Sequence, residues 1–350
     1  MTPAGLRAFG SRWGWVLAVA VAVSTVPFLT SNTFLVKILT LAAVNVIVVG
    51  GLALLFGYAG QVSLGHAAFV GIGAYAATYL TSVAGWPWPA AAAAAVALSV
   101  AGGLLLALPS LRLRGHYLAM ATLGFGEIVH LGFVEAEPLT GGVDGMRVPP
   151  AVVAGLDLST PAASYLLTWG CALLAMVVLR NVVTRRPGRA MLAMHGSEEG
   201  AVACGIDLTG WKVAAFGVSA ALAGLAGVLY AQRTGFVSPS QFGLTASILF
   251  VAMAVLGGAR SLLGPAVAAV LLTLLPYIDA LVPGLPRAAA EFVQAWVEVL
   301  VGFVIIAVML FAPSGLAGLM RGAAARLRPA SGPADTGAEE DAAAGGGEAA

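Results

Sequence analysis

The apolar residues of this chain come in runs of about 20, separated by short joints that are polar or rich in glycine. A helix that crosses the ~30 Å hydrocarbon core of a bilayer needs ~20 residues, because each residue adds about 1.5 Å. Only 9% of the 350 residues are charged, against roughly 25% in soluble domains, which is too few for a water-facing surface. We therefore predict an all-α, polytopic integral membrane protein.

Ten candidate transmembrane spans can be marked by hydropathy and length. They cover residues 15–29, 34–56, 62–83, 89–108, 116–134, 162–179, 213–232, 244–256, 263–278 and 292–311. The eighth and ninth are short for a bilayer, so we expect eight to ten helices, with ten favoured. We expect the first to be a retained helix, because residues 24–27 form a poor signal-peptide cleavage site.

The distribution of lysine and arginine predicts the orientation, since cytoplasmic loops carry an excess of positive charge. When ten spans are threaded with the N-terminus inside, 13 of the 17 basic residues fall on the cytoplasmic side. Both termini are therefore predicted to be cytoplasmic.

We predict one transmembrane domain over residues 1–328, followed by a disordered cytoplasmic tail over residues 329–350, which lacks apolar periodicity. Two loops interrupt the domain. Residues 135–161 form an acidic external loop rich in glycine and proline, and residues 180–212 form the longest cytoplasmic loop.

Several functional classes are disfavoured by what the sequence lacks. A net charge of +1 without a long basic run argues against nucleic acid as a partner. The two lysines follow valine and tryptophan, so no Gly-Lys of a phosphate-binding loop exists, and neither His-Glu-x-x-His nor Gly-x-Ser-x-Gly occurs. We expect no catalytic residue, no metal and no cofactor bound by this chain, and hence no enzyme.

The loop 180–212 contains the signals of a short helix. Ser197 is a plausible N-cap, Glu198 and Glu199 would lie in the first turn and complement the helix dipole, and Gly205 would end the helix. Asp207 would then cap the next span. The alternative is an ordinary solvated loop, because an isolated helix of about seven residues is marginal in water.

Ionisable residues inside a span are functional candidates, because a charge at the bilayer centre costs about 3 kcal/mol on insertion scales. Glu127 and His130 lie three apart in the fifth span, on one helix face, where each can satisfy the other. They are candidates to line a pathway, and the alternative is a structural hydrogen bond between helices. The pattern also resembles half of a carboxylate-bridged metal site, but a second copy is missing.

A glycine-rich segment, residues 57–66, breaks the apolar pattern between the second and third spans. Transporters place unwound backbone and the N-termini of half-helices at such breaks, where an anionic group can bind. Gln61, Ser63 and His66 are therefore candidates to face a pathway or gate. The alternative is a tight cytoplasmic turn capped by Ser63, with His66 buried in packing.

Small residues recur four apart in the seventh span, as Ala220-x-x-x-Gly224 and Ala223-x-x-x-Gly227. Small side chains let two helix backbones approach closely. We predict that they mark a close helix contact and not a ligand site.

With these segments assigned, the sequence resembles the inner-membrane permeases of branched-chain amino acid ABC importers, of the LivM type. The similarity runs from the second span to about residue 317. Its most specific stretches are GYAGQVSLGHA (57–67), LRGHY (113–117), ATLGFGEI (121–128), LTGG (139–142), GID (205–207), SAALAGLAG (219–227) and LGG (256–258).

The resemblance implies a permease subunit that imports hydrophobic, branched-chain amino acids across the cell inner membrane. It implies four kinds of partner: a second, LivH-like permease subunit, two ATP-binding cassette subunits that hold ATP and Mg²⁺, an extracytoplasmic substrate-binding protein, and membrane lipid. The short helix at 198–205 would be the coupling helix that docks on the ATPase. Its expected residues are Ser197, Glu198, Glu199, Gly200, Ala201 and Gly205.

Two alternatives to this function stay open. Related permeases carry urea, other amino acids or nucleosides. A proton-coupled secondary transporter that uses Glu127 and His130 is the rival from another class.

Overall fold

A computed structural model describes residues 25, 32–113, 115–153 and 155–277, and beyond these residues 291, 295, 296, 299, 302, 303, 306, 307, 310 and 315–318. The first predicted span, apart from Thr25, lies outside the described residues. So do most of the tenth span, both termini and the predicted tail 329–350.

The described chain is mostly helical. Its helices are α2 (Thr33–Ala53), continued by the π-helix η1 (Leu54–Tyr58), then α3 (His66–Ser82), α4 (Trp88–Ser110), α5 (His116–Glu135), α6 (Glu137–Thr140), α7 (Pro161–Thr184), α8 (Arg186–Gly196), α9 (Glu198–Ala203), α10 (Leu208–Thr234), α11 (Leu244–Gly257) and α12 (Leu263–Leu274). Three short 3₁₀ turns complete the set: η2 (Gly142–Asp144), η3 (Pro239–Phe242) and η4 (Leu275–Tyr277).

Six helical segments in the described part of the chain are long and apolar enough to cross a membrane, and one shorter apolar segment, Leu263–Tyr277, follows. The six segments are Thr33–Tyr58, Trp88–Ser110, His116–Glu135, Pro161–Thr184, Leu208–Thr234 and Pro239–Gly257. The prediction for the third span, residues 62–83, began too early. Its helix, α3, has 17 residues and starts at His66, and residues 59–65 before it are not helical.

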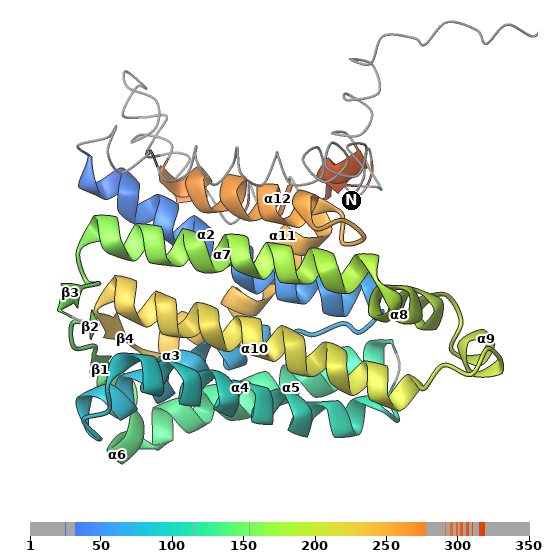
Figure 1. Ribbon diagram of the computed structural model, residues 1–350, viewed down its shortest axis with the longest axis horizontal. Helices are drawn as coiled ribbons and strands as arrows, with labels where there is room; N and C mark the ends of the chain where they lie inside the picture. The colour runs from blue at the N-terminus through green and yellow to red at the C-terminus, as the bar shows by residue number, and fades with distance from the viewer. Residues whose placement is uncertain are drawn as a thin grey trace, which may run out of the picture.

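The long helices lie side by side along the longest axis of the molecule (Figure 1). At one end α8 and α9 project beyond the bundle, and at the other end lie α6 and the short strands. Strand β1 (Met146–Arg147) pairs antiparallel with β4 (Phe236–Val237), and β2 (Val152–Val153) pairs with β3 (Leu156–Asp157). The two predicted loops, 135–161 and 180–212, therefore lie at opposite ends of the bundle.

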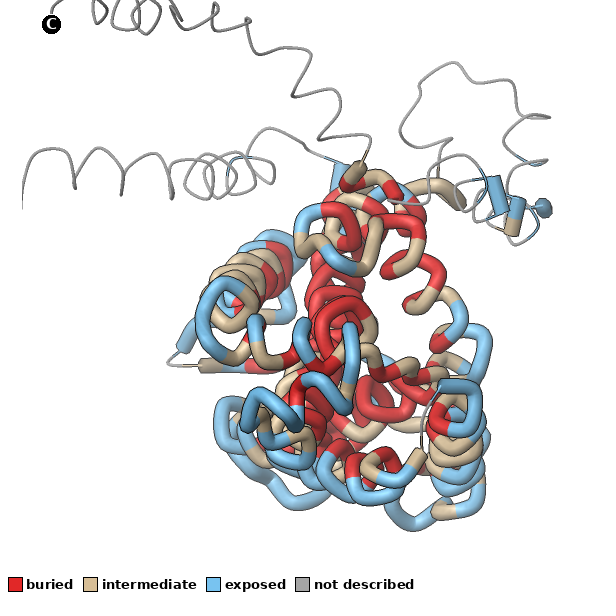
Figure 2. The backbone as a smooth tube through the Cα atoms, turned by 90° about the vertical axis from the view of Figure 1, so that its right-hand side faces the viewer, coloured by how far each residue is buried: buried red, intermediate tan, exposed pale blue. Residues whose placement is uncertain are grey.

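The core is formed mainly by α2, α3 and α10, and buried residues fill the centre of the molecule when it is viewed along the helices (Figure 2). Glycine brings these helices together: a Cβ at Gly227 would collide with the backbone of Val70, and a Cβ at Gly73 with the backbone of Gly224. The predicted close contact of the seventh span is thus confirmed as the packing of α10 on α3. Such contacts give dense van der Waals packing where lipid supplies no hydrophobic drive.

Candidate functional site

Helix α9 starts at the residue that the sequence predicts and ends at Ala203, two residues before the predicted end at Gly205. The Oγ of Ser197 accepts a hydrogen bond from the backbone N–H of Gly200 at 3.1 Å, and Glu198 and Glu199 occupy the first turn. After the helix, Gly205 takes a left-handed conformation with φ +75°. Asp207 caps α10 by accepting from the N–H groups of residues 209 and 210. The folded geometry is therefore a short capped helix and not an irregular loop.

An ion pair attaches α9 to the base of α10. The Lys212 Nζ lies 2.8 Å from the Glu198 Oε1, and the lysine side chain is 2% exposed. A buried ammonium needs such a partner, because removing a charge from water is costly. The sequence gives no local signal for this pair, because Glu198 and Lys212 lie on two different helices.

A second helix precedes α9 and was not predicted. Helix α8 begins with Arg186 and Pro187 in its first turn and ends at Gly196. The ring of His195 packs against Gly60, which has φ +69°, and a Cβ there would lie 2.9 Å from the His195 Nδ1. Partial burial, and secondarily the charge of Arg260, lower the pKa of His195 below its ordinary value.

A cavity of about 330 Å³ lies beside this contact, between α8, α9 and the residues that follow the π-helix. It is lined by residues 59–61 and 194–199. Gln61 is 5% exposed, and its Oε1 has no hydrogen-bond partner. Gln61, on the glycine-rich break (residues 57–66), and Glu198, on α9, were predicted to belong to separate sites, and they line one polar cavity.

The break between α2 and α3 is held at both sides by backbone contacts. A Cβ at Gly57 would overlap the carbonyl of Ala259, and the Tyr58 hydroxyl donates a hydrogen bond to the Arg260 carbonyl at 3.3 Å. At its other end, Gly65 lies directly against α5, where a Cβ would collide with the Thr122 carbonyl. Close approach of the backbones explains why glycine is needed at both positions.

The three polar candidates of the break are enclosed. Gln61, Ser63 and His66 are 5%, 1% and 0% exposed, and the His66 Nε2 forms a hydrogen bond of 3.2 Å with the Ser219 Oγ on α10. The N-cap of α3 is Gly65, with no side-chain cap, so Ser63 does not cap that helix. The Ser63 Oγ and the His66 Nδ1 have no hydrogen-bond partner.

Helices α3 and α11 begin next to each other inside the bundle. The backbone N–H of Ala67, in the first turn of α3, donates to the Ser247 Oγ in the first turn of α11 at 3.0 Å. Neither helix has a side-chain N-cap. Helix α3 runs toward β1 and α6, whereas α11 ends at Gly257, beside the segment that contacts Gly57. Two positive helix ends therefore meet near the middle of the bundle.

A cavity of about 10 Å³ lies at this meeting point, which is room for roughly one water molecule. Its lining comes from the end of the break, α5 and the start of α11, and includes Leu64, Gly126, Glu127, Gly243 and Ser247. The site is closed to a larger solute in this conformation.

Glu127 and His130 do not satisfy each other, which corrects the prediction that they pair. Both residues are described, and neither a hydrogen bond nor an ion pair joins them. Glu127 is exposed and lines the small cavity, while the His130 Nδ1 is buried and unbonded beside Gly243. A spacing of three residues permits contact on a helix, but it does not require the two polar groups to meet.

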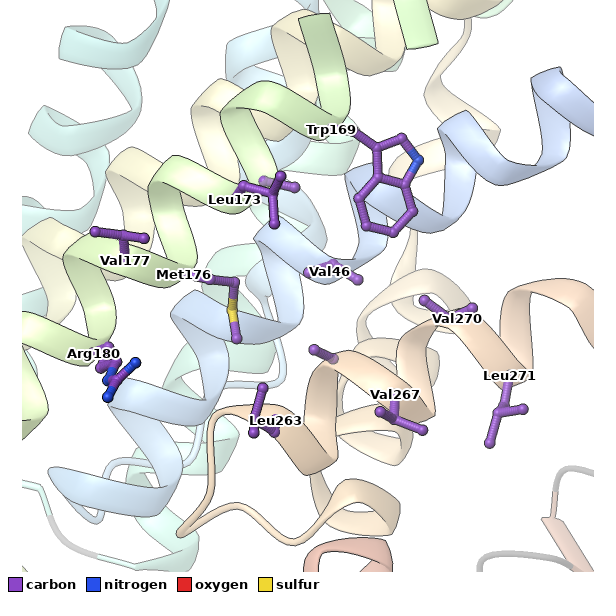
Figure 3. A pocket seen from close by; sticks show the side chains of 12 residues that line it. Val46, Trp169, Leu173, Met176, Val177, Arg180, Leu263, Val267, Val270 and Leu271 are labelled. Atoms are coloured by element: carbon purple, nitrogen blue, oxygen red, sulfur yellow. The ribbon is translucent and has the colours of Figure 1, made fainter. Parts of the chain in front are cut away.

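An apolar groove of about 300 Å³ lies between α2, α7 and α12, away from these residues. Figure 3 shows Trp169 and Met176 on one side of it, Val267 and Val270 on another, and Arg180 near one end. Among its lining residues only Arg180 is charged. A zwitterionic solute would lack a matched pair of groups there.

Comparisons with known proteins agree on one family. The model of the family "Branched-chain amino acid transport system / permease component" matches residues 34–309. The LivM permease proteins of the high-affinity branched-chain amino acid transport systems of Salmonella typhimurium and Escherichia coli are 31% and 30% identical, over 88% of this chain and 75% of each relative. No solved structure matches.

Proposed function

The chain belongs to the family of permease components of branched-chain amino acid transport systems, and from this premise we propose that it carries branched-chain amino acids into the cytoplasm as one subunit of an ATP-driven importer. The observation that supports this is the family match over residues 34–309, from α2 through the predicted tenth span. The chain is a transport subunit of the inner membrane and not an enzyme.

The proposed assembly contains a second, LivH-like permease, two ATP-binding subunits and an extracytoplasmic binding protein. ATP and Mg²⁺ would bind in the ATP-binding subunits. The absence of a Gly-Lys dipeptide from this sequence supports a motor on separate chains.

We assign the coupling role to α9. A helix of six residues is marginal by itself, but Ser197 caps α9, the Glu198–Lys212 pair anchors it, and it projects from one end of the bundle (Figure 1). The exposed Glu199 and Val202 are available to a partner surface. A short polar helix anchored in this way can receive a push from a docked ATPase.

The proposed pathway runs along the exposed face of α5. Glu127 stands 11 residues after the first residue of α5, near the middle of an apolar span of 20 residues. A carboxylate facing lipid at that depth would cost about 3 kcal/mol. We therefore expect protein or water to cover this face, which makes the second permease subunit its natural neighbour.

The chemistry around Glu127 suits an amino acid. Its carboxylate can accept hydrogen bonds from the substrate ammonium group, and the uncapped N-termini of α3 and α11 can donate to the substrate carboxylate. Leu64, Leu123 and Phe242 supply apolar surface. Because the cavity is closed, we expect it to open when the transporter changes access, with Gln61, Ser63, His66 and His130 adjoining it.

Reconstitution tests the function directly. The tagged chain is isolated from its own membranes with its bound partners and placed in liposomes with ATP inside or outside. We expect accumulation of labelled leucine, isoleucine or valine that requires ATP, survives a protonophore, and stops when the Walker lysine of the ATPase is replaced. Uptake without ATP that a protonophore abolishes would favour the proton-coupled rival, while ATP-driven uptake of another solute alone would change the substrate.

Crosslinking tests the role of α9. Cys204 is exposed directly after this helix, so the background carries Cys204→Ser and Cys171→Ser. In that background we expect Glu199→Cys to crosslink to a cysteine placed on the ATPase. Failure at every position from 197 to 205 would remove the assignment.

A further inference from the structure

Lys212 is the starting point, because it is a fully enclosed cation in a chain with only two lysines. It lies near the start of α10, where a positive charge gains nothing from the helix dipole. Its ion-pair partner, Glu198, comes from α9. The energetic reason for Lys212 is therefore the connection between α9 and α10.

Seven residues further along α10, Ser219 makes the next connection. Seven residues correspond to about two helical turns and ~10 Å, so Lys212 and Ser219 lie on one face of the helix. Ser219 is 1% exposed and is hydrogen-bonded to His66, the first residue of α3. Two polar contacts on one face of α10 thus join this helix to α9 near its start and, about two turns further on, to the first residue of α3.

We propose that Glu198 and Lys212 are positioning residues that make α9 and α10 move as one unit. Movement of α9 would then shift α10 along its contact with α3 and would reach the N-terminus of α3 through Ser219 and His66. The inference rests on the proposed coupling role of α9. It adds the route by which that movement enters the membrane domain.

An ion pair suits this task better than an apolar contact would. A buried charge left without its partner is strongly disfavoured, so the two helices cannot separate or slide by a turn without a large cost. His195 of α8 packs against Gly60 of the break, but the His195 Nδ1 has no hydrogen-bond partner. This van der Waals contact fixes the relative position of the two segments less strictly than the Glu198–Lys212 ion pair fixes α9 against α10.

The experiment measures ATP hydrolysed per amino acid transported. The complete transporter is isolated through a tag on the ATPase, so that only assembled complexes are reconstituted. The variants are Lys212→Met, Glu198→Gln, the conservative Lys212→Arg, and His195→Ala, which tests the contact of α8 with the break. The matched control is Lys37→Met, which removes the only other lysine, an exposed residue at the far end of α2.

Since coupling between sites is typically worth 5- to 150-fold, we expect Lys212→Met and Glu198→Gln to raise the ATP-to-substrate ratio by about tenfold. Lys212→Arg and Lys37→Met should stay near the wild-type ratio. The crosslink from Glu199→Cys to the ATPase should persist in the Lys212→Met background, because docking is retained while transmission is lost.

A wild-type ratio in both Lys212→Met and Glu198→Gln would overturn the proposal, and so would His195→Ala being the variant that uncouples the transporter. Should Lys212→Met fail to assemble, Glu198→Gln decides the question alone. If the wild-type complex shows neither ATP-driven uptake nor the α9 crosslink, the proposed function itself fails, and that result is separate from the ratio.

Discussion

Helices α10 and α5 are both long and apolar enough to cross a membrane, yet they are packed into the molecule in opposite ways. Helix α10 is packed against α3 and α4, and Gly224 and Gly227 touch the backbone of α3. Its polar residues also have partners: Lys212 pairs with Glu198, and Ser219 bonds to His66. Helix α5 lies at the edge of the bundle. A Cβ added at Gly124, on its open face, would meet no other atom within 4 Å. The first helix is largely buried by the rest of its own chain, whereas the second presents an exposed face.

The exposed face of α5 also differs in chemistry from an ordinary lipid-facing surface. Tyr117, Met120 and Ile128 are 73%, 69% and 72% exposed, which suits lipid or protein equally. Glu127 among them suits lipid poorly. The proposed functional role of this face therefore depends on Glu127.

The most severe test of this contrast is Gly227→Leu on α10. The new side chain would meet the Val70 backbone, which cannot rotate away, so we expect a loss of about 3 kcal/mol or little folded protein. Thermal unfolding in detergent, read by size-exclusion chromatography, measures the effect. The control is Gly124→Leu on the open face of α5, and equal melting temperatures for the two variants would contradict the contrast.

Glu127→Leu should produce the reverse result. Because Glu127 is exposed, we expect the free energy of unfolding to change by less than about 0.5 kcal/mol. Loss of a charged hydrogen bond to substrate is worth about 1.5–3 kcal/mol, so ATP-driven uptake should fall by about tenfold or more. Ile128→Leu is the matched control, and unchanged uptake in Glu127→Leu would remove Glu127 from the pathway.

A smaller effect is expected from Ser219→Ala. The substitution deletes the hydrogen bond to His66 and leaves both nitrogens of a fully buried ring without a partner, which costs about 1–3 kcal/mol. The melting temperature in detergent should drop, whereas exposed Ser240→Ala should leave it unchanged. Equal stability of the two variants would show that His66 finds another partner.

The smallest effect concerns pH and His195. Its folded pKa lies below the ordinary 6.5, so the unfolded chain binds the proton more readily. The stabilising contribution of the neutral ring is present above about pH 6.5 and decreases as the pH falls below it. Melting temperatures measured from pH 7.5 to 5.5 should decline less in His195→Gln than in the wild type, and parallel declines would exclude the effect.

Much of this molecule was predictable from local sequence. Hydropathy placed the starts of α5, α11 and α12, and the caps Ser197 and Asp207 marked where α9 and α10 begin. Small residues identified the face of α10 that meets α3. These features depend on interactions within one or two turns or on the transfer of a whole segment into lipid, and both can be judged without knowing the neighbours.

The polar site could be predicted only as a set of residues. The tertiary structure decided that Glu127 and His130 part, that Lys212 pairs with Glu198, and that His66 bonds Ser219, which is 153 residues away. It also decided that α3 and α11 begin side by side. The sequence alone determined which segments enter the membrane, because the free energy of transferring a segment into lipid is a sum over its own residues. Which polar groups find hydrogen-bond partners depends on helices that meet only after folding.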